Sequence, residues 1–181
     1  MVKRTYHAII DAFNRLIEVR PFEDITVADI IEEAEVSKAT FYRYFKDKYD
    51  VMNSNYKDLL DRFLHVGDCT NYRDLYFNLY SAGETELRLL KGNFRTSGIN
   101  SFENYIYSYS KQIVVMITMM NRDGKGLTSA EDLQLDVFCY GISYMYKKWI
   151  LGGSYDLTAD EAADKLYELM PETLKHYWLP E

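Results

Sequence analysis

Residues 37–48 read SKATFYRYFKDK and combine four aromatic residues with four cationic ones. On a helix that starts at Lys38, Phe41 and Phe45 are four residues apart and share one face. Lys38 and Tyr42 are also four residues apart, and they share a different face. The pattern therefore predicts a short helix with an apolar face for packing and a second face rich in hydroxyl and ammonium groups.

The preceding residues, 26–36, read TVADIIEEAEV and predict a second short helix. Thr26 is placed as the N-cap, with Asp29 at the third position as a shorter stand-in for the usual Glu of a capping box. The helix would cover residues 27–34, and residues 35–37 would form the turn. Two short helices joined by such a turn form a helix-turn-helix, whose second helix can enter a DNA major groove.

Helical periodicity and a low content of chain breakers predict an all-α fold for the whole chain, which has 9 Gly and 3 Pro in 181 residues. A first helix is expected over residues 3–20, before Pro21. Thr128 with Glu131, and Thr158 with Glu161, have capping-box spacing. The remaining helices are expected near residues 48–65, 71–82, 84–94, 101–121, 129–151 and 158–170.

The segment TVADIIEEAEVSKATFYRYFKDK (26–48) resembles the N-terminal DNA-binding domain of Tet-repressor-like (TetR family) regulators. This family often has Gly where Glu35 and Ala39 stand here. The resemblance implies a helix-turn-helix domain in residues 1–50 and an all-helical effector-binding and dimerisation domain in residues 51–181. It also implies that the last two long helices pair with their copies in a homodimer. The stretch FYRYFKDKYDVMN (41–53) is similar to the branch linked to dihydroxyacetone kinase operons, in which a protein co-regulator can replace a small-molecule effector.

Hydroxyl groups can donate hydrogen bonds to phosphate oxygens, and Lys side chains can neutralise the DNA backbone. Within the motif we expect DNA contacts from nine residues; outside it the same side chains would be read as ordinary solvated surface. The predicted contacts are Thr26, Ser37, Lys38, Ala39, Thr40, Tyr42, Tyr44, Lys46 and Lys48.

The 17 tyrosines raise a second question, because several pairs in the C-terminal part share a helical face. One reading is an aromatic effector pocket with hydroxyl groups. The other, which we favour, is core and interface packing, in which Tyr buries its ring and keeps its hydroxyl group in water. The candidate pocket residues are Tyr72, Tyr76, Tyr105, Tyr109, Tyr140 and Tyr144.

The net charge of −7 argues against polyanion binding by the whole surface. Residues 1–50 hold 8 basic and 10 acidic residues, so any charge that faces DNA must be segregated onto one side. Cys69 and Cys139 have no metal or redox spacing, and the three histidines form no known catalytic or metal motif. We expect no enzyme activity, no catalytic residue, no cofactor and no metal.

The N-terminus has no signal-peptide pattern, and the longest apolar run, IVVMITMM (113–120), is too short to cross a bilayer. We therefore expect a cytoplasmic protein without membrane contact. The expected function is that of a homodimeric transcription regulator, a repressor, that binds a double-stranded DNA operator. Its control would come from an unknown small-molecule effector or a protein co-regulator, with the helix at 48–65 as the lever between the two parts.

Overall fold

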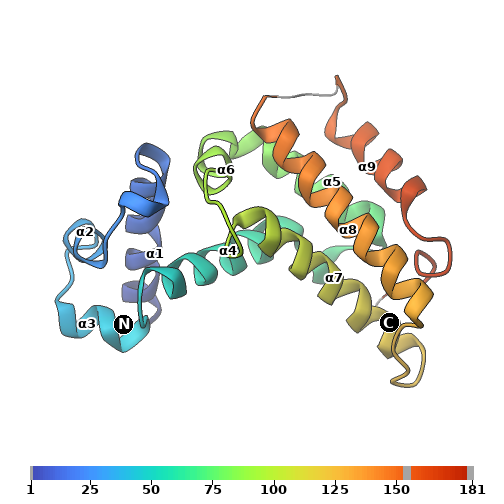
Figure 1. The fold of residues 1–181 in the computed structure, drawn as a ribbon, viewed down its shortest axis with the longest axis horizontal. Coiled ribbons are helices and arrows are strands. Elements are labelled where there is room, and N and C mark those ends of the chain that lie inside the picture. Colours follow the sequence, from blue (N-terminus) through green and yellow to red (C-terminus); the bar gives the residue numbers. More distant parts are fainter. Residues whose placement is uncertain (1, 153–155, 179–181) are drawn as a thin grey trace. The chain divides into compact units, whose positions relative to one another are not determined.

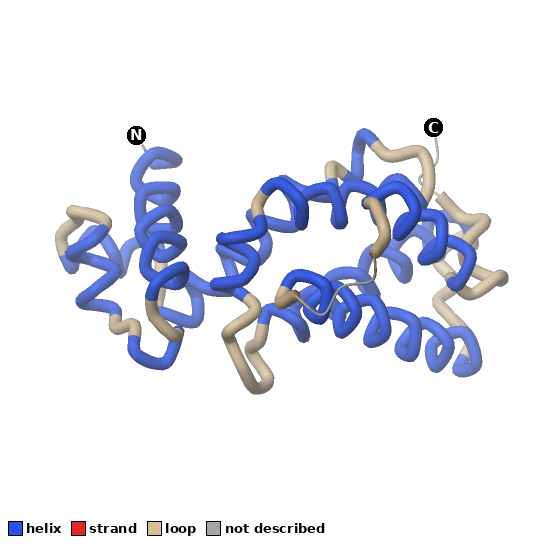
Figure 2. The backbone as a smooth tube through the Cα atoms, turned by 90° about the horizontal axis from the view of Figure 1, so that it is seen from above, coloured by secondary structure: helices blue, strands red, loops and turns tan. Residues whose placement is uncertain are grey.

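The computed structural model describes residues 2–152 and 156–178. These residues form nine α-helices and two short 3-10 helices, with no β-strand among them (Figures 1 and 2). The all-α prediction is confirmed. The chain divides into two compact units, which are residues 1–60 with 87–102 and residues 61–86 with 103–181. Helix α4 (Lys48–Leu64) passes from the first unit into the second without a break, so no element ends at residue 50.

The first unit consists of α1 (Val2–Val19), the 3-10 helix η1 (Phe22–Asp24), α2 (Val27–Glu33), α3 (Lys38–Tyr44), most of α4, and α6 (Leu87–Asn93). Its core is built from the apolar faces of α1, α2 and α3, together with residues of α4. The buried side chains include Ile9, Phe13, Ile17, Ile30, Phe41, Phe45 and Met52. Helix α6 packs against α1 so closely that a Cβ on Gly92 would lie 2.8 Å from the carbonyl oxygen of Ile17.

Helix α2 has only seven residues and is fixed at both ends by hydrogen bonds. At its start, Thr26 and Asp29 form the predicted capping box. At its end, the Glu35 N–H donates to the Glu32 carbonyl and the Val36 N–H donates to the Ile31 carbonyl, which is the Schellman pattern. Glu35 has the left-handed φ of 52° that this pattern requires.

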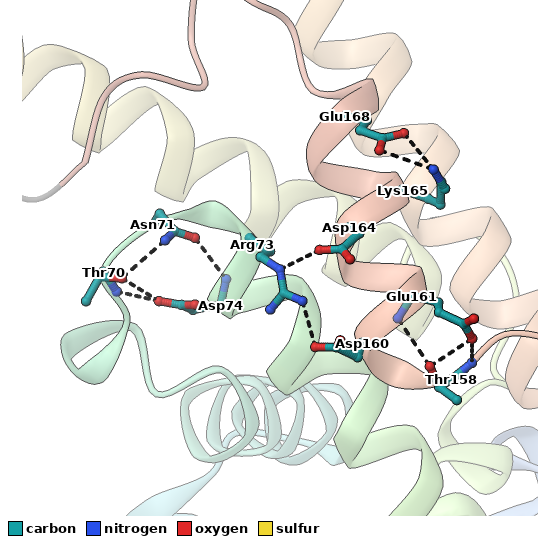
Figure 3. Close-up of polar contacts among 10 residues, drawn as sticks. All are labelled: Thr70, Asn71, Arg73, Asp74, Thr158, Asp160, Glu161, Asp164, Lys165 and Glu168. Carbon is teal, nitrogen blue, oxygen red and sulfur yellow. Dashed lines mark hydrogen bonds and ion pairs between the residues drawn. The ribbon is translucent and has the colours of Figure 1, made fainter.

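The second unit consists of the end of α4, the 3-10 helix η2 (Val66–Asp68), α5 (Tyr72–Thr85), nearly all of α7 (Phe102–Asn121), α8 (Ser129–Ile150) and α9 (Ala159–Leu169). Figure 3 shows how Arg73 of α5 joins α9, with its guanidinium 2.6 Å from both Asp160 and Asp164. The predicted capping boxes at Thr128 and Thr158 are both present. Lys111 of α7 bridges to Asp132 and Asp136 of α8, at 2.8 and 2.6 Å.

The helix positions predicted from the sequence agree with the structure to within about one turn. The short helix predicted to start at Lys38 is α3, which covers Lys38–Tyr44. The largest difference is at α5 and α6, where α5 continues to Thr85 and α6 begins at Leu87. Glu86 alone separates these two helices, whereas the sequence pattern predicts the break at residue 83.

Candidate nucleic-acid interface

Helix α3 has the two faces that the sequence predicts. Phe41 and Phe45 anchor it, with 0% and 2% of their surface exposed, and Phe41 packs near Phe45 with ring centroids 6.0 Å apart. Tyr42, on a different face, is 51% exposed. Lys38 and Ala39, one turn before it, are exposed as well. The helix therefore offers a cation, a phenol and a small residue to a large ligand while its aromatic anchors stay inside.

Ser37 and Thr40 use their hydroxyl groups at the start of α3. Ser37 is the N-cap, and its Oγ accepts a hydrogen bond from the Thr40 N–H at 3.1 Å. The two hydroxyl oxygens are 2.9 Å apart and hydrogen bonded to each other. Both residues therefore fix the start of the helix, and the exposed Ser37 hydroxyl can still accept or donate a further hydrogen bond.

Thr26 is exposed, but its polar atoms belong to the cap of α2. Its N–H and its hydroxyl donate to the same oxygen of Asp29, at 2.7 and 2.6 Å. The hydrogen bond from the Thr26 hydroxyl lowers the pKa of Asp29. The Arg20 guanidinium, 3.3 Å from the Asp29 carboxylate, also lowers this pKa. A second acidic residue of α2, Glu33, is paired with Arg15 at 2.5 Å. Two carboxylates of α2 are thus paired with Arg15 of α1 and with Arg20, which directly follows α1.

Tyr44, Lys46 and Lys48 lie in three different environments. Tyr44 is half-buried, and Lys46 is exposed. Lys48, at the start of α4, has its ammonium 3.1, 3.1 and 2.9 Å from the carbonyl oxygens of Phe22, Glu23 and Ile25. A Lys ammonium has three donors, and all three donors of Lys48 have acceptors within the protein, while the predicted phosphate contact of Lys48 stays a prediction.

Arg43 is absent from the predicted contacts although it is exposed on α3. It lies four residues after Ala39, so the two residues share a face next to that of Lys38 and Tyr42. This spacing could have identified it from the sequence. A guanidinium at this position can bind a phosphate or a guanine edge through two parallel hydrogen bonds.

Charge is distributed unevenly between the two units. The first unit holds 12 basic and 11 acidic residues, and the second holds 9 basic and 17 acidic residues. Their net charges are therefore +1 and −8. Part of the difference comes from α6 and the residues after it, because Arg88, Lys91 and Arg95 belong to the first unit. The unit that carries the helix-turn-helix is thus the one that a polyanion would approach with less repulsion.

The six tyrosines predicted as an effector pocket differ widely in exposure. Tyr72 and Tyr76 are buried, with 1% and 7% of their surface exposed, whereas Tyr140 and Tyr144 of α8 are 52% and 58% exposed. Burial raises the pKa of Tyr72, and its hydroxyl is the only one of the six that is buried without a hydrogen-bond partner among the described residues.

Three further tyrosines of the predicted pocket, Tyr105, Tyr109 and Tyr140, make contacts within the second unit. The Tyr109 hydroxyl donates to Asp61 at 2.5 Å, and the Tyr105 and Tyr109 rings are stacked with centroids 6.3 Å apart. The Tyr140 ring stacks on the Tyr107 ring, with centroids 3.8 Å apart. These contacts agree better with packing than with a shared pocket.

The described residues contain no group of three or more His, Cys, Asp or Glu side chains that could hold a metal ion. Nor does any helix in the described part of the chain have the length and apolar content needed to cross a membrane.

Comparison with known proteins agrees with the geometry of α2 and α3. EthR, an HTH-type transcriptional regulator from Mycobacterium tuberculosis, is 33% identical over 95 residues, which are 52% of this chain and 38% of EthR. The match thus spans less than two fifths of this curated relative.

Two solved structures show the same fold over nearly the whole chain. The dihydroxyacetone kinase operon activator DhaS has 14% identity and a TM-score of 0.64, with 97% of this chain and 98% of DhaS covered. The regulator FadR from Bacillus subtilis, solved with stearoyl-CoA, has 17% identity and a TM-score of 0.55, with 92% and 98% covered. All three proteins are named as regulators of transcription or of an operon, and none as an enzyme. Residues 9–54, which include the whole helix-turn-helix, match the model of the bacterial regulatory proteins of the tetR family.

Proposed function

We propose that this chain is a homodimeric, sequence-specific DNA-binding repressor of transcription that acts in the cytoplasm. The observation that carries the proposal is the orientation of α3, whose anchors Phe41 and Phe45 are buried while Lys38, Tyr42 and Arg43 are exposed. A seven-residue helix of this kind can enter the major groove, which is about 12 Å wide. Lys38, Arg43 and Lys46 would neutralise phosphates or contact guanine, and Tyr42 would donate to phosphate.

A homodimer is supported by an apolar surface of α8 and α9. Leu133 and Val137 are 66% and 67% exposed on α8, and Leu169 of α9 is 71% exposed. Together with neighbouring residues they line a groove of about 640 Å³. Gly141 is exposed in the middle of α8, and a Cβ there would meet no atom of this chain within 4 Å. Gly in the middle of a helix destabilises that helix relative to Ala. The close approach of a helix from a second copy of the chain would explain why Gly stands at this position.

Control by an effector requires that the effector bind one conformation of the dimer better than the other. We propose that the effector binds within residues 51–181 and that α4, which belongs to both units, transmits the difference. The buried Tyr72 hydroxyl, which has no partner among the described residues, is the strongest single candidate for an effector contact. FadR, whose structure contains stearoyl-CoA, shares the fold at 17% identity.

A second candidate is control by a protein partner instead of a small molecule. It is favoured by a groove of about 640 Å³ along α7, which is lined by Val115, Met116, Met119 and Met120 among others. Exposed methionines adapt to many apolar partners, and the net charge of −8 of this unit would attract a basic one. Co-purification of a stoichiometric protein that is lost in a Met119→Glu variant would favour this candidate over a small-molecule effector.

The proposal is tested by incubating the purified chain with fragmented genomic DNA from its own organism and sequencing the bound fragments. We expect enrichment of a site with two-fold symmetry, with half-sites about 10–10.5 base pairs apart or a multiple of that spacing. Recovery of fragments without a shared sequence, or of none, would contradict sequence-specific binding.

A further inference from the structure

Between α1 and α2, three backbone carbonyl oxygens accept hydrogen bonds from the side chain of Lys48, which lies at the start of α4. The ammonium of Lys48 lies within 3.1 Å of the carbonyl oxygens of Phe22, Glu23 and Ile25. It also lies 4.6 Å from the centroid of the Phe22 ring, within the range of a cation–π contact. All of these groups belong to the first unit.

The position of these carbonyls explains why a cation is held there. Phe22 and Glu23 belong to the three-residue helix η1, and a carbonyl oxygen has two lone pairs, so each can accept a hydrogen bond from the ammonium group. Ile25, which is fully buried, directly precedes Thr26, the N-cap of α2. The Lys48 ammonium therefore fixes the point at which the chain leaves η1 and enters the helix-turn-helix.

We propose that Lys48 is a positioning residue for DNA binding: it fastens the first turn of α4 to the entry of α2 and does not contact phosphate. The inference rests on the proposed DNA-binding function. To reach a phosphate, the ammonium would have to leave carbonyls that have no other side-chain donor among the described contacts, and an exposed ion pair in return would be weakened by salt. Because α4 continues to Leu64, a change at its far end would reach the entry of α2 through this residue.

Three variants distinguish positioning from phosphate contact. Lys48→Met removes the charge but keeps most of the side chain. Lys48→Arg keeps the charge, but its planar guanidinium cannot direct donors at three carbonyls around one point. Lys46→Met is the matched control, because Lys46 is an exposed lysine two residues earlier.

The DNA readout is the dependence of affinity on salt, measured between 50 and 200 mM with a duplex taken from upstream of the gene. Each lost phosphate contact reduces the slope of log K against log salt by about 0.9. We expect Lys46→Met to reduce the slope in this way. We expect Lys48→Met and Lys48→Arg to weaken binding roughly 3- to 10-fold at every salt concentration, with the wild-type slope. A reduced slope in Lys48→Met, with wild-type affinity in Lys48→Arg, would overturn the inference.

A second readout needs no DNA. Hydrogen exchange of the amides of Asp24 and Ile25, which bond to Pro21 and Phe22, should be faster in both Lys48 variants and unchanged in Lys46→Met. Unchanged exchange in Lys48→Met would overturn the inference whatever happens with DNA. If the wild-type chain binds no duplex but the exchange result holds, it is the proposed function that fails, and the fastening of η1 by Lys48 stands.

Discussion

Two phenylalanines four residues apart determine which side of α3 meets solvent. Phe41 and Phe45 are buried against the remainder of the first unit, with Ile30 of α2 in the same core. The period of the helix then places Lys38 and Tyr42 on the outside. The spacing could be read from the sequence because apolar side chains at helical intervals signal a buried face. The hydrogen bonds of Lys48 could not be predicted from the sequence, because their acceptors are backbone carbonyls, which every residue has.

At the residue scale, Glu35 is held in a conformation that glycine adopts more easily. Its φ of 52° lies in the left-handed region, which costs an ordinary L-residue roughly 1–2 kcal/mol. We predict that Glu35→Gly raises the free energy of unfolding by about 0.5–1 kcal/mol, since the greater freedom of glycine in the unfolded chain offsets part of the gain. Urea denaturation measures the change. Glu35→Ala is the control and should give no such gain, and equal stabilisation by both variants would contradict the prediction.

A second prediction at the residue scale concerns pH. The Arg122 guanidinium, which forms two hydrogen bonds with Glu131 at 3.0 and 2.6 Å, lowers the pKa of Glu131 to about 2 from an ordinary 4.5. A lowered folded-state pKa stabilises the fold above pH 4.5 and loses this contribution as pH falls toward 2. The difference in unfolding free energy between wild type and Glu131→Gln should therefore be constant near pH 7 and shrink between those two values. Urea titrations at a series of pH values test this, and a difference that does not vary with pH would contradict it.

At the element scale, short helices depend on their ends and on close contacts with their neighbours. Helix α2 has a capping box at one end and a Schellman pattern at the other. The N-terminal capping boxes of α2, α8 and α9 could be predicted from a Thr that lies three residues before an Asp or a Glu. The close contact of α6 with α1 could not be predicted, because a single Gly in a sequence does not reveal which distant backbone approaches it. For the same reason, no sequence pattern indicates that α6 belongs to the same unit as the helix-turn-helix.

The contact of α6 with α1 predicts that Gly92→Ala destabilises the first unit. The new Cβ would lie 2.8 Å from the Ile17 carbonyl oxygen and 3.3 Å from the Glu18 Cα, which are backbone atoms that cannot rotate away. We expect a loss of about 1–3 kcal/mol of unfolding free energy, as for other overpacked sites. Gly67→Ala, where a Cβ meets nothing within 4 Å, should change it by less than about 0.5 kcal/mol. Denaturant unfolding of both variants measures the two changes. Equal free energies of unfolding in the two variants would contradict the close contact between α6 and α1.

At the scale of the whole molecule, the two units differ in charge and in exposed apolar surface. The first has a net charge of +1 and presents α3, whereas the second has a net charge of −8 and presents the apolar faces of α7, α8 and α9. The tyrosines show the limit of sequence patterns at this scale. Tyr72 with Tyr76, and Tyr140 with Tyr144, have the same spacing, yet the first pair is buried and the second is exposed. Spacing shows that residues share a face, and only tertiary packing decides whether that face is covered.

The exposed face of α8 predicts where a homodimer would break. Val137→Glu places a charge at the centre of the apolar face and should raise the dimer dissociation constant at least tenfold, because the charge would be buried without a partner. Sedimentation velocity over a range of protein concentrations measures this. Met120→Glu, at a side chain that is 53% exposed on α7, is the control and should leave the dimer intact. A monomer in the wild type, or an unchanged dimer in Val137→Glu, would contradict the assignment of this face.

The central claim is that the exposed side of α3 reads DNA. The most direct measurement is the affinity of the wild type, Tyr42→Ala and Lys38→Met for the genomic site recovered by selection and for a scrambled duplex of equal length. Both variants should keep their helical content, and both should lose affinity for the selected site, with Lys38→Met also reducing the salt slope by about 0.9 per lost contact. Wild-type affinity in both folded variants would show that DNA, if it binds at all, does not bind this face of α3.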